Sequence, residues 1–239
     1  MTRRRARSVA AWAALVVGAF AGFLAYIGYF GGPVFETYSP DRARSGGPAA
    51  VVLSGDMGLR MGVGGAIAQG LADRGIPVTA VNSLTYWRVQ RSPAESAALV
   101  AEAARRALQQ SANGRVLLVG QSFGADMLHV GLEAMPADLR RHVQLVALLV
   151  PTDTLYFRAS PAELFGYGNP DGDAIASGRK LDWVSTLCVY GAEEDDSLCP
   201  HLTQRNVWPV KLPGDHYLNR DVQSVLRTLG TAIDASNRS

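Results

Sequence analysis

The sequence has no excess of basic residues outside its first few positions. The chain has 23 Lys and Arg against 21 Asp and Glu, but Arg3, Arg4, Arg5 and Arg7 all precede the first long apolar run. The remainder has 19 basic residues (23 − 4) against 21 acidic ones, a net charge of −2. That balance excludes the broad basic surface typical of nucleic-acid-binding proteins.

Charge is absent from a long N-terminal stretch, residues 9–30. A helix of that length reaches roughly 30 Å, the thickness of a bilayer's hydrocarbon core, and Trp12 and Tyr26 lie where interfacial aromatics are common. Because the arginines come first, we predict a cytoplasmic leader over 1–8, a transmembrane signal anchor over 9–30 and export of the rest. A signal peptide cleaved after Ala19-Phe20-Ala21 is the alternative.

Cysteine is almost absent: Cys188 and Cys199 are the only two, eleven positions apart. An exported chain with an even number of cysteines favours a disulfide between them. The alternative is a pair of unrelated buried thiols.

Internal repeats and low-complexity tracts are absent too. Residues 31–48, rich in Gly, Pro and Ser, predict a linker to a domain over 49–239. In that domain short apolar runs alternate with helical patterns. We predict strands over 49–55, 77–83, 115–122, 143–151, 186–191 and 208–214, and helices over 63–74, after Ser92, over 123–133 and over 219–233. Strands that are apolar throughout are covered on both faces, which predicts a three-layer α/β domain with a mainly parallel sheet.

A nucleophile motif lies between the third predicted strand and the helix that follows it. Gly120-Gln121-Ser122-Phe123-Gly124 matches G-x-S-x-G, in which a serine projects from a sharp strand-to-helix turn between small residues. We predict Ser122 as a nucleophile. A glycine-flanked turn with an inert serine is the alternative.

A serine nucleophile needs a base, and four histidines are available. His216 lies just after the last strand, where the chain order Ser…acid…His places the base. His201 follows the acidic run, His129 falls inside a helix, and His142 lies beside two arginines. We predict His216 as the base.

The carboxylate partner is expected in the acidic run 193–196, after strand 186–191. Asp153, after the preceding strand, is a rival. The run lacks EF-hand spacing, so we predict no metal site there.

Two backbone amides are needed to stabilise an oxyanion. One is expected from Phe123, directly after the serine, and the other from Asp56 or Met57 in the loop after the first strand. That loop lacks the G-K-[ST] of a P-loop.

Five motifs in order carry a resemblance to a known family: SGDMG (54–58), NSLTYW (82–87), GQSFGAD (120–126), YGAEEDDSLCP (190–200) and LPGDHY (212–217). Together they resemble the bacterial virulence protein VirJ/AcvB family. The resemblance implies an α/β-hydrolase fold, a periplasmic location, hydrolysis of aminoacylated phosphatidylglycerol and an association with type IV secretion.

Carried over to this chain, the resemblance implies that Ser122 and His216 are catalytic, that the acid lies within 193–196 and that Cys188 pairs with Cys199. α/β hydrolases commonly place the acid four residues before a proline, which makes Asp196 the first choice and Asp195 the second.

These inferences together predict a periplasmic serine esterase, anchored in the inner membrane, that hydrolyses lysyl- or alanyl-phosphatidylglycerol through an acyl-enzyme. Its partner would be a phospholipid headgroup, with no metal, organic cofactor or nucleic acid. The alternative is a non-catalytic periplasmic adaptor that binds secretion-system proteins.

Overall fold

The computed structural model describes residues 3–159 and 169–238 of the chain. The predicted leader falls partly outside this description, because residues 1–2 and the side chains of 3–7 and 9 are not included.

The centre of the fold is a seven-stranded sheet with the order β1-β3-β2-β4-β5-β8-β9. All neighbouring strands are parallel except β1, which runs antiparallel to β3. The strands are β1 (Phe35–Tyr38), β2 (Ala49–Leu53), β3 (Val78–Val81), β4 (Val116–Gln121), β5 (Val143–Leu149), β8 (Thr186–Gly191) and β9 (Val207–Leu212). A separate small antiparallel pair contains β6 (Thr154–Leu155) and β7 (Gly172–Asp173).

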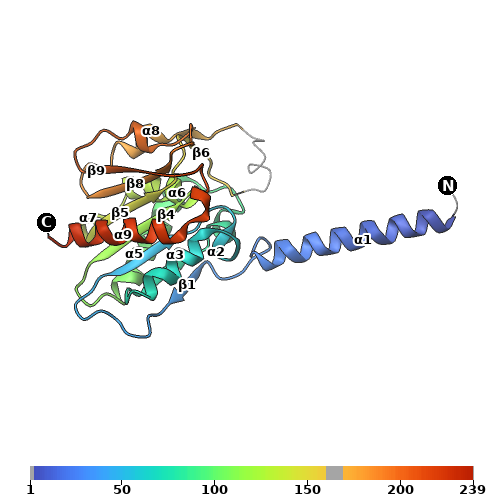
Figure 1. The fold of residues 1–239 in the computed structure, drawn as a ribbon, viewed down its shortest axis with the longest axis horizontal. Helices are drawn as coiled ribbons and strands as arrows, with labels where there is room; N and C mark the ends of the chain where they lie inside the picture. The colour runs from blue at the N-terminus through green and yellow to red at the C-terminus, as the bar shows by residue number, and fades with distance from the viewer. Residues whose placement is uncertain (1–2, 160–168, 239) are drawn as a thin grey trace.

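Helices cover both faces of this sheet (Figure 1). The helices of the described residues are α1 (Arg3–Tyr26), α2 (Gly58–Met61), α3 (Val63–Ala72), α4 (Ser83–Trp87), α5 (Pro93–Leu108), α6 (Phe123–Glu133), α7 (Ala137–Arg140), α8 (Ala174–Gly178) and α9 (Val222–Ser236), with 3₁₀ turns η2 (Cys199–His201) and η3 (Leu218–Arg220).

Alternation along β2 shows why the domain has three layers. Val51 and Leu53 pack on one side with residues of α5 and α6, whereas Ala50 and Val52 pack on the other with residues of α3 and α9. Successive side chains of a strand point to opposite faces, so an all-apolar strand needs a cover on each side. The predicted three-layer domain with a mainly parallel sheet is confirmed.

The start of α5 is also as predicted. Ser92 accepts a hydrogen bond from the Glu95 amide at 3.2 Å, and the Glu95 carboxylate accepts one from the Ser92 amide at 2.8 Å, with Pro93 at the first helical position. This reciprocal capping satisfies two amides that the first helical turn leaves unpaired.

The predicted linker over 31–48 is wrong in its middle. Residues 35–38 form the edge strand β1, which pairs Phe35 with Val81 and Tyr38 with Val78. Upstream of it, Ile27 is only 3% exposed and belongs to the core. The globular body therefore begins before residue 49. Its first strand was missed because it has only four residues, three half-buried and one exposed, next to a stretch rich in glycine and proline, and such a pattern is a weak strand signal.

The N-terminal helix α1 projects away from the body (Figure 1). Its apolar side chains, among them Trp12 and Phe20, are exposed, at 69% and 57%. Within the parts of the chain that the structure describes, no helix has the combined length and hydropathy of a membrane span.

Candidate active site

Ser122 sits at the sharp turn between β4 and α6, with φ 53° and ψ −127°. Its amide donates to the Leu149 carbonyl at 2.8 Å, which fixes the turn against β5. A side chain at Gly120 would lie 2.6 Å from the Ala125 Cα, and one at Gly124 would overlap the Leu53 and Ser54 carbonyls. Both positions therefore require glycine, as the strained turn of the G-x-S-x-G motif predicts.

His216 meets this serine from the loop after β9. The Ser122 Oγ and His216 Nε2 lie 2.7 Å apart, although the residues are 94 positions apart in the chain. The serine and the histidine predicted from the sequence are thus brought into hydrogen-bond contact.

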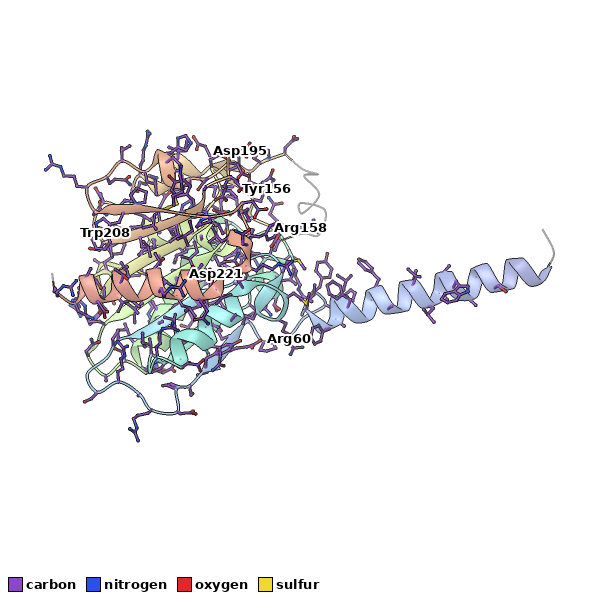
Figure 2. All side chains as sticks on the ribbon, viewed as in Figure 1. Arg60, Tyr156, Arg158, Asp195, Trp208 and Asp221 are labelled. Carbon is purple, nitrogen blue, oxygen red and sulfur yellow. A yellow bond between two sulfur atoms is a disulfide. The ribbon has the colours of Figure 1, made fainter. Side chains whose placement is uncertain are left out.

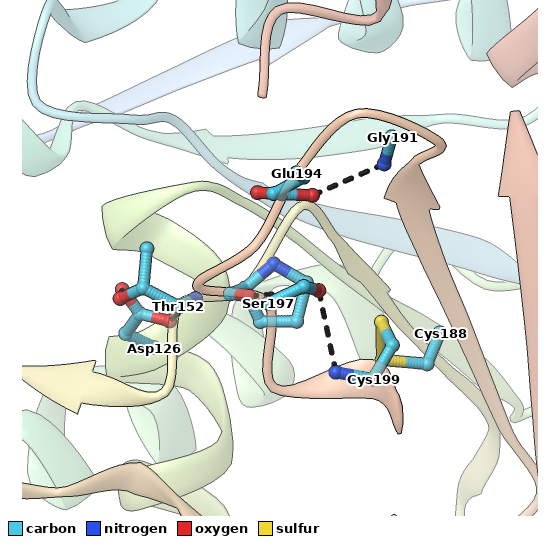
Figure 3. Close-up of a disulfide and its surroundings, with 8 residues drawn as sticks. Asp126, Thr152, Cys188, Gly191, Glu194, Ser197 and Cys199 are labelled. Carbon is cyan, nitrogen blue, oxygen red and sulfur yellow. Dashed lines mark hydrogen bonds between the residues drawn. A yellow bond between two sulfur atoms is a disulfide. The ribbon is translucent and has the colours of Figure 1, made fainter. Parts of the chain in front are cut away.

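Glu194 lies on the other side of the imidazole. Its Oε1 is 2.6 Å from His216 Nδ1, and its side chain is only 1% exposed. Its Oε2 accepts a hydrogen bond from the Gly191 amide at 3.0 Å (Figure 3). An ionised carboxylate only accepts hydrogen bonds, so Nδ1 carries the proton and Nε2 is free to accept the one on Ser122.

The structure therefore corrects the choice of carboxylate. Asp196 and Asp195 are both exposed, and Asp195 lies at the outer edge of the body (Figure 2). Asp153, the rival candidate for the acid, contacts this loop through its backbone: its amide donates a hydrogen bond to the Asp196 carbonyl at 2.8 Å. It is Glu194 that contacts the histidine, inside the predicted run 193–196 but at neither chosen position.

The reason is the turn that follows β8. The Glu194 amide donates to the Gly191 carbonyl at 3.3 Å, and the Glu193 amide donates to the Gly214 carbonyl at 3.0 Å. A side chain at Gly191 would overlap the Asp215 carbonyl, so the end of β8 lies directly against the histidine loop. Counting forward from the strand end, rather than back from Pro200, would have favoured Glu193 and Glu194.

The predicted disulfide between Cys188 and Cys199 is confirmed (Figure 3). It joins β8 to η2 and closes the loop that carries Glu194. The segment just before Cys199 is also fixed. The Leu198 amide donates a hydrogen bond to the Pro151 carbonyl at 2.9 Å, and Ser197 pairs with Thr152 in an isolated antiparallel β-bridge. The carboxylate thus lies in a loop fixed at both ends.

A cavity of about 600 Å³ opens beside the serine and the histidine. Asp56 and Met57, from the loop after β2, also line it. The rest of its wall is mostly apolar and comes largely from α2, α3 and α9, with Met61, Val63, Ile67, Val222 and Val225. A mainly apolar cleft with a few converging polar groups is typical of a small-molecule site.

The family model for the bacterial virulence protein (VirJ) matches residues 48–237. The chain belongs to the VirJ family. The match covers most of the chain, including all five motifs and the three residues Ser122, His216 and Glu194. No curated protein matches the sequence.

Solved structures show that this VirJ-family chain has the α/β-hydrolase fold. Est1E from Butyrivibrio proteoclasticus has a TM-score of 0.56 at 12% identity, over 84% of this chain and 94% of its own. XC6422 from Xanthomonas campestris, an α/β serine hydrolase without a lid, has a TM-score of 0.54 at 17% identity, over 85% and 91%. YbtT, a type II thioesterase of yersiniabactin biosynthesis, has a TM-score of 0.54 at 15% identity, over 85% and 99%.

The oxyanion donors predicted for this VirJ-family site stay a prediction. Phe123 is the first residue of α6, so its amide has no acceptor within the helix. The residues from Gly55 to Gly58 form a turn, closed by a 3.1 Å bond from the Gly58 amide to the Gly55 carbonyl. Asp56 and Met57 occupy the two central positions of this turn, facing the same cavity as Ser122.

Electrostatics around His216 favour its charged form. Burial is the largest single influence and lowers its pKa, but the hydrogen bond and charge of Glu194, together with the charges of Asp126 and Asp196, outweigh it and raise the pKa above the usual 6.5. A raised pKa makes the imidazole a stronger base towards the serine proton.

Asp126, in the first turn of α6, was not found from the sequence. It is 4% exposed, and its oxygens contact the Thr152 amide at 2.9 Å and the Thr152 Oγ1 at 3.0 Å. The same hydroxyl, which donates to Asp126, also lies 2.8 Å from the Thr154 carbonyl, so the carboxyl and that carbonyl share one donor. Burial raises the pKa of Asp126 to about 8, although the hydrogen bonds from Thr152 act in the opposite direction.

The three other histidines do not contact Ser122. His129 is fully buried in α6, where its Nδ1 lies 3.1 Å from the Ser177 hydroxyl and burial lowers its pKa to about 3. His142 contacts the Gly114 carbonyl at 2.8 Å, and His201 is exposed. Across residues 3–159 and 169–238, no group of three or more His, Cys, Asp and Glu side chains is placed to hold a metal ion.

Proposed function

We propose that this VirJ-family protein is a serine hydrolase that cleaves the aminoacyl ester of aminoacyl-phosphatidylglycerol. One observation carries the proposal: the continuous hydrogen-bonded series from Ser122 through His216 to Glu194, at 2.7 and 2.6 Å, beside a cavity. A nucleophile, a base and a group that orients the base are the elements that acyl transfer from an ester requires.

Acylation would begin when Ser122 Oγ attacks the ester carbonyl carbon while His216 Nε2 takes the serine proton. Glu194 would hold the imidazole in the correct tautomer and stabilise its positive charge. As the tetrahedral intermediate collapses, the bond to the glycerol oxygen breaks and His216 returns the proton to that oxygen. The products of this step are phosphatidylglycerol and an aminoacyl-serine.

Deacylation would repeat these transfers with water. His216 takes a proton from a water molecule while the water oxygen attacks the acyl carbon. His216 then gives the proton to Ser122 Oγ as the acyl–serine bond breaks. A free amino acid leaves and the serine is restored. These steps require no oxidant, reductant or organic cofactor.

The position of the cavity supports a lipid substrate. Met61 of α2 lines it, and the neighbouring Arg60 donates a hydrogen bond to the Tyr26 carbonyl at the end of α1, at 2.9 Å. Figure 2 shows Arg60 where α1 joins the body. One wall of the cavity is thus attached to the root of the helix that carries the exposed apolar side chains.

Export of the body and its retention at the inner membrane by residues 9–30 are part of the same proposal. The uncharged stretch behind four arginines supports it, and the disulfide is consistent with an oxidising compartment. Fractionation of expressing cells tests it: the full chain should stay in the membrane pellet after carbonate washing, and a protease added to spheroplasts should digest the body. Recovery of an intact body in the cytosol contradicts the proposal.

The activity is tested with the full chain and its Ser122→Ala variant on lysyl- and alanyl-phosphatidylglycerol in mixed micelles. Wild-type protein should release the amino acid, and the variant should lose about 10³-fold or more of that rate. Equal release by both proteins excludes Ser122 as the nucleophile. Release by neither, from protein shown to be folded, favours the non-catalytic adaptor for secretion-system proteins.

A further inference from the structure

Asp56 is an acidic side chain in the cavity that the proposed mechanism does not use. It lines the cavity together with Ser122 and His216, from the turn that follows β2. A negative charge there opposes the oxyanion that forms during ester hydrolysis, so its presence needs an explanation.

The turn that carries Asp56 is held in place from several sides. The Gly55 amide donates to the Gln121 side chain at 3.1 Å, directly before the nucleophile, and the buried Ser54 hydroxyl accepts from the Ser83 amide at 3.0 Å. A side chain at Gly55 would lie 2.8 Å from Gln121 Oε1. Asp56 therefore has a fixed position relative to Ser122.

The Asp56 carboxylate forms no salt bridge within the described parts of the chain. The four ion pairs found there all involve other acids, namely Glu95, Glu102, Glu133 and Glu194. Burial is the main influence on Asp56 and raises its pKa, whereas His216 and the backbone amides of Met57 and Asp56 itself act in the opposite direction. A partly desolvated carboxylate in a cavity is stabilised when a bound cation pairs with it.

We propose that Asp56 binds the α-ammonium group of the substrate and so selects aminoacyl esters over simple acyl esters. This inference rests on the proposed function. In an aminoacyl ester only the α-carbon separates the ammonium from the carbonyl carbon that Ser122 attacks. A carboxylate on the turn beside the nucleophile is therefore within reach of the ammonium when the carbonyl is in position. The ion pair also cancels the repulsion between Asp56 and the oxyanion, which an ester without an amine leaves in place.

The test compares alanyl-phosphatidylglycerol with its N-acetyl derivative, which lacks the positive charge. Wild-type full chain should prefer the free amine by about 10- to 100-fold in kcat/KM, the size expected for a charged hydrogen bond. Asp56→Asn should lose that preference: kcat/KM on the free amine falls, mainly through KM, and its ratio to kcat/KM on the N-acetyl ester approaches one. Asp56→Glu, which keeps the charge, should restore part of the preference. Asp138→Asn, the same change at an exposed acid of α7, should alter neither rate.

Equal hydrolysis of both esters by wild-type protein overturns the inference without any variant, and leaves the proposed function intact. An equal loss on both esters in Asp56→Asn also overturns it, because that pattern indicates a structural role for the turn or an effect on His216. If wild-type protein hydrolyses neither lipid, the proposed function itself fails and the inference fails with it.

Discussion

Glu194 and His216 share a 2.6 Å hydrogen bond, and the side chain of the glutamate is almost completely buried. Replacement of Glu194 by Gln should lower kcat by about 10³- to 10⁴-fold, because an amide neither balances the imidazolium charge nor favours the productive tautomer. The measurement is amino-acid release from alanyl-phosphatidylglycerol at saturating substrate.

The matched controls are Asp195→Asn and Asp196→Asn in the same loop. Each should keep kcat within about threefold of the wild-type value, because surface substitutions away from special features have small effects. A collapse of activity in Asp196→Asn with an active Glu194→Gln would reverse the assignment.

The pH dependence of hydrolysis should report the raised pKa of His216. The base must be neutral to accept the serine proton, so kcat/KM should rise with pH and reach half its maximum above pH 6.5. Asp196→Asn removes one of the charges that raise this pKa and should shift the midpoint to lower pH, whereas Asp195→Asn should not. A midpoint at or below 6.5 in wild-type protein contradicts the electrostatics described for the site.

Asp126 should make the protein less stable as the pH rises. Its pKa is about 8 in the folded chain against 3.8 for the unperturbed group, so between these values the native state keeps a proton that the unfolded state has lost. Stability then falls with pH across that window. Asparagine can accept from the Thr152 amide and donate to its hydroxyl, so Asp126→Asn should keep both contacts. Urea unfolding measures this effect. Between pH 5 and pH 9 the free energy of unfolding of the variant should fall by at least ~1 kcal/mol less than that of the wild type.

An equal loss of stability in the variant and the wild type between pH 5 and pH 9 would show that Asp126 is already ionised in the native state at pH 5.

Removal of the disulfide should weaken both the fold and the site. The bridge closes a loop of eleven residues, for which chain entropy gives about 3 kcal/mol of stabilisation. The Cys188→Ala/Cys199→Ala double variant should therefore lose about that much free energy of unfolding and, because Glu194 lies in the closed loop, part of its kcat. Urea titration under non-reducing conditions measures the first effect. An unchanged kcat would show that the hydrogen bonds of Ser197 and Leu198 are sufficient to position the loop.

Local signals predicted most of this fold. The capping box of Ser92 and Glu95 depends only on residues that are close in the chain. The same is true of the apolar strands and of the turn around Ser122, so all three features could be predicted from the sequence. Strand β1 was missed because its stability comes from pairing with β3, whose partner residues lie 40 (78 − 38) to 46 (81 − 35) positions further along the chain. His216 was found because strand order alone restricts the base to one loop.

The choice among the four acids required information that strand order does not contain. Which carboxylate reaches His216 depends on how the turn after Gly191 folds back and on the extra methylene of glutamate. Asp126 was also missed, because its partner Thr152 lies 26 positions away, in the segment that follows β5. The direction of a side chain in a loop depends on how the loop packs in three dimensions, whereas the position of the loop can be predicted largely from the order of strands in the sequence.

The connection between α1 and the body is short and well anchored. Ile27 is buried, the Thr85 hydroxyl donates to the Gly28 carbonyl at 3.2 Å, and eight residues later the chain is already in the sheet. A long flexible tether would let the domain rotate freely about its attachment. Here the anchored connection fixes the orientation of α1 relative to the cavity. The surface that binds α1 therefore determines the direction in which the cavity opens. It also determines how far from that surface a bound ester can lie.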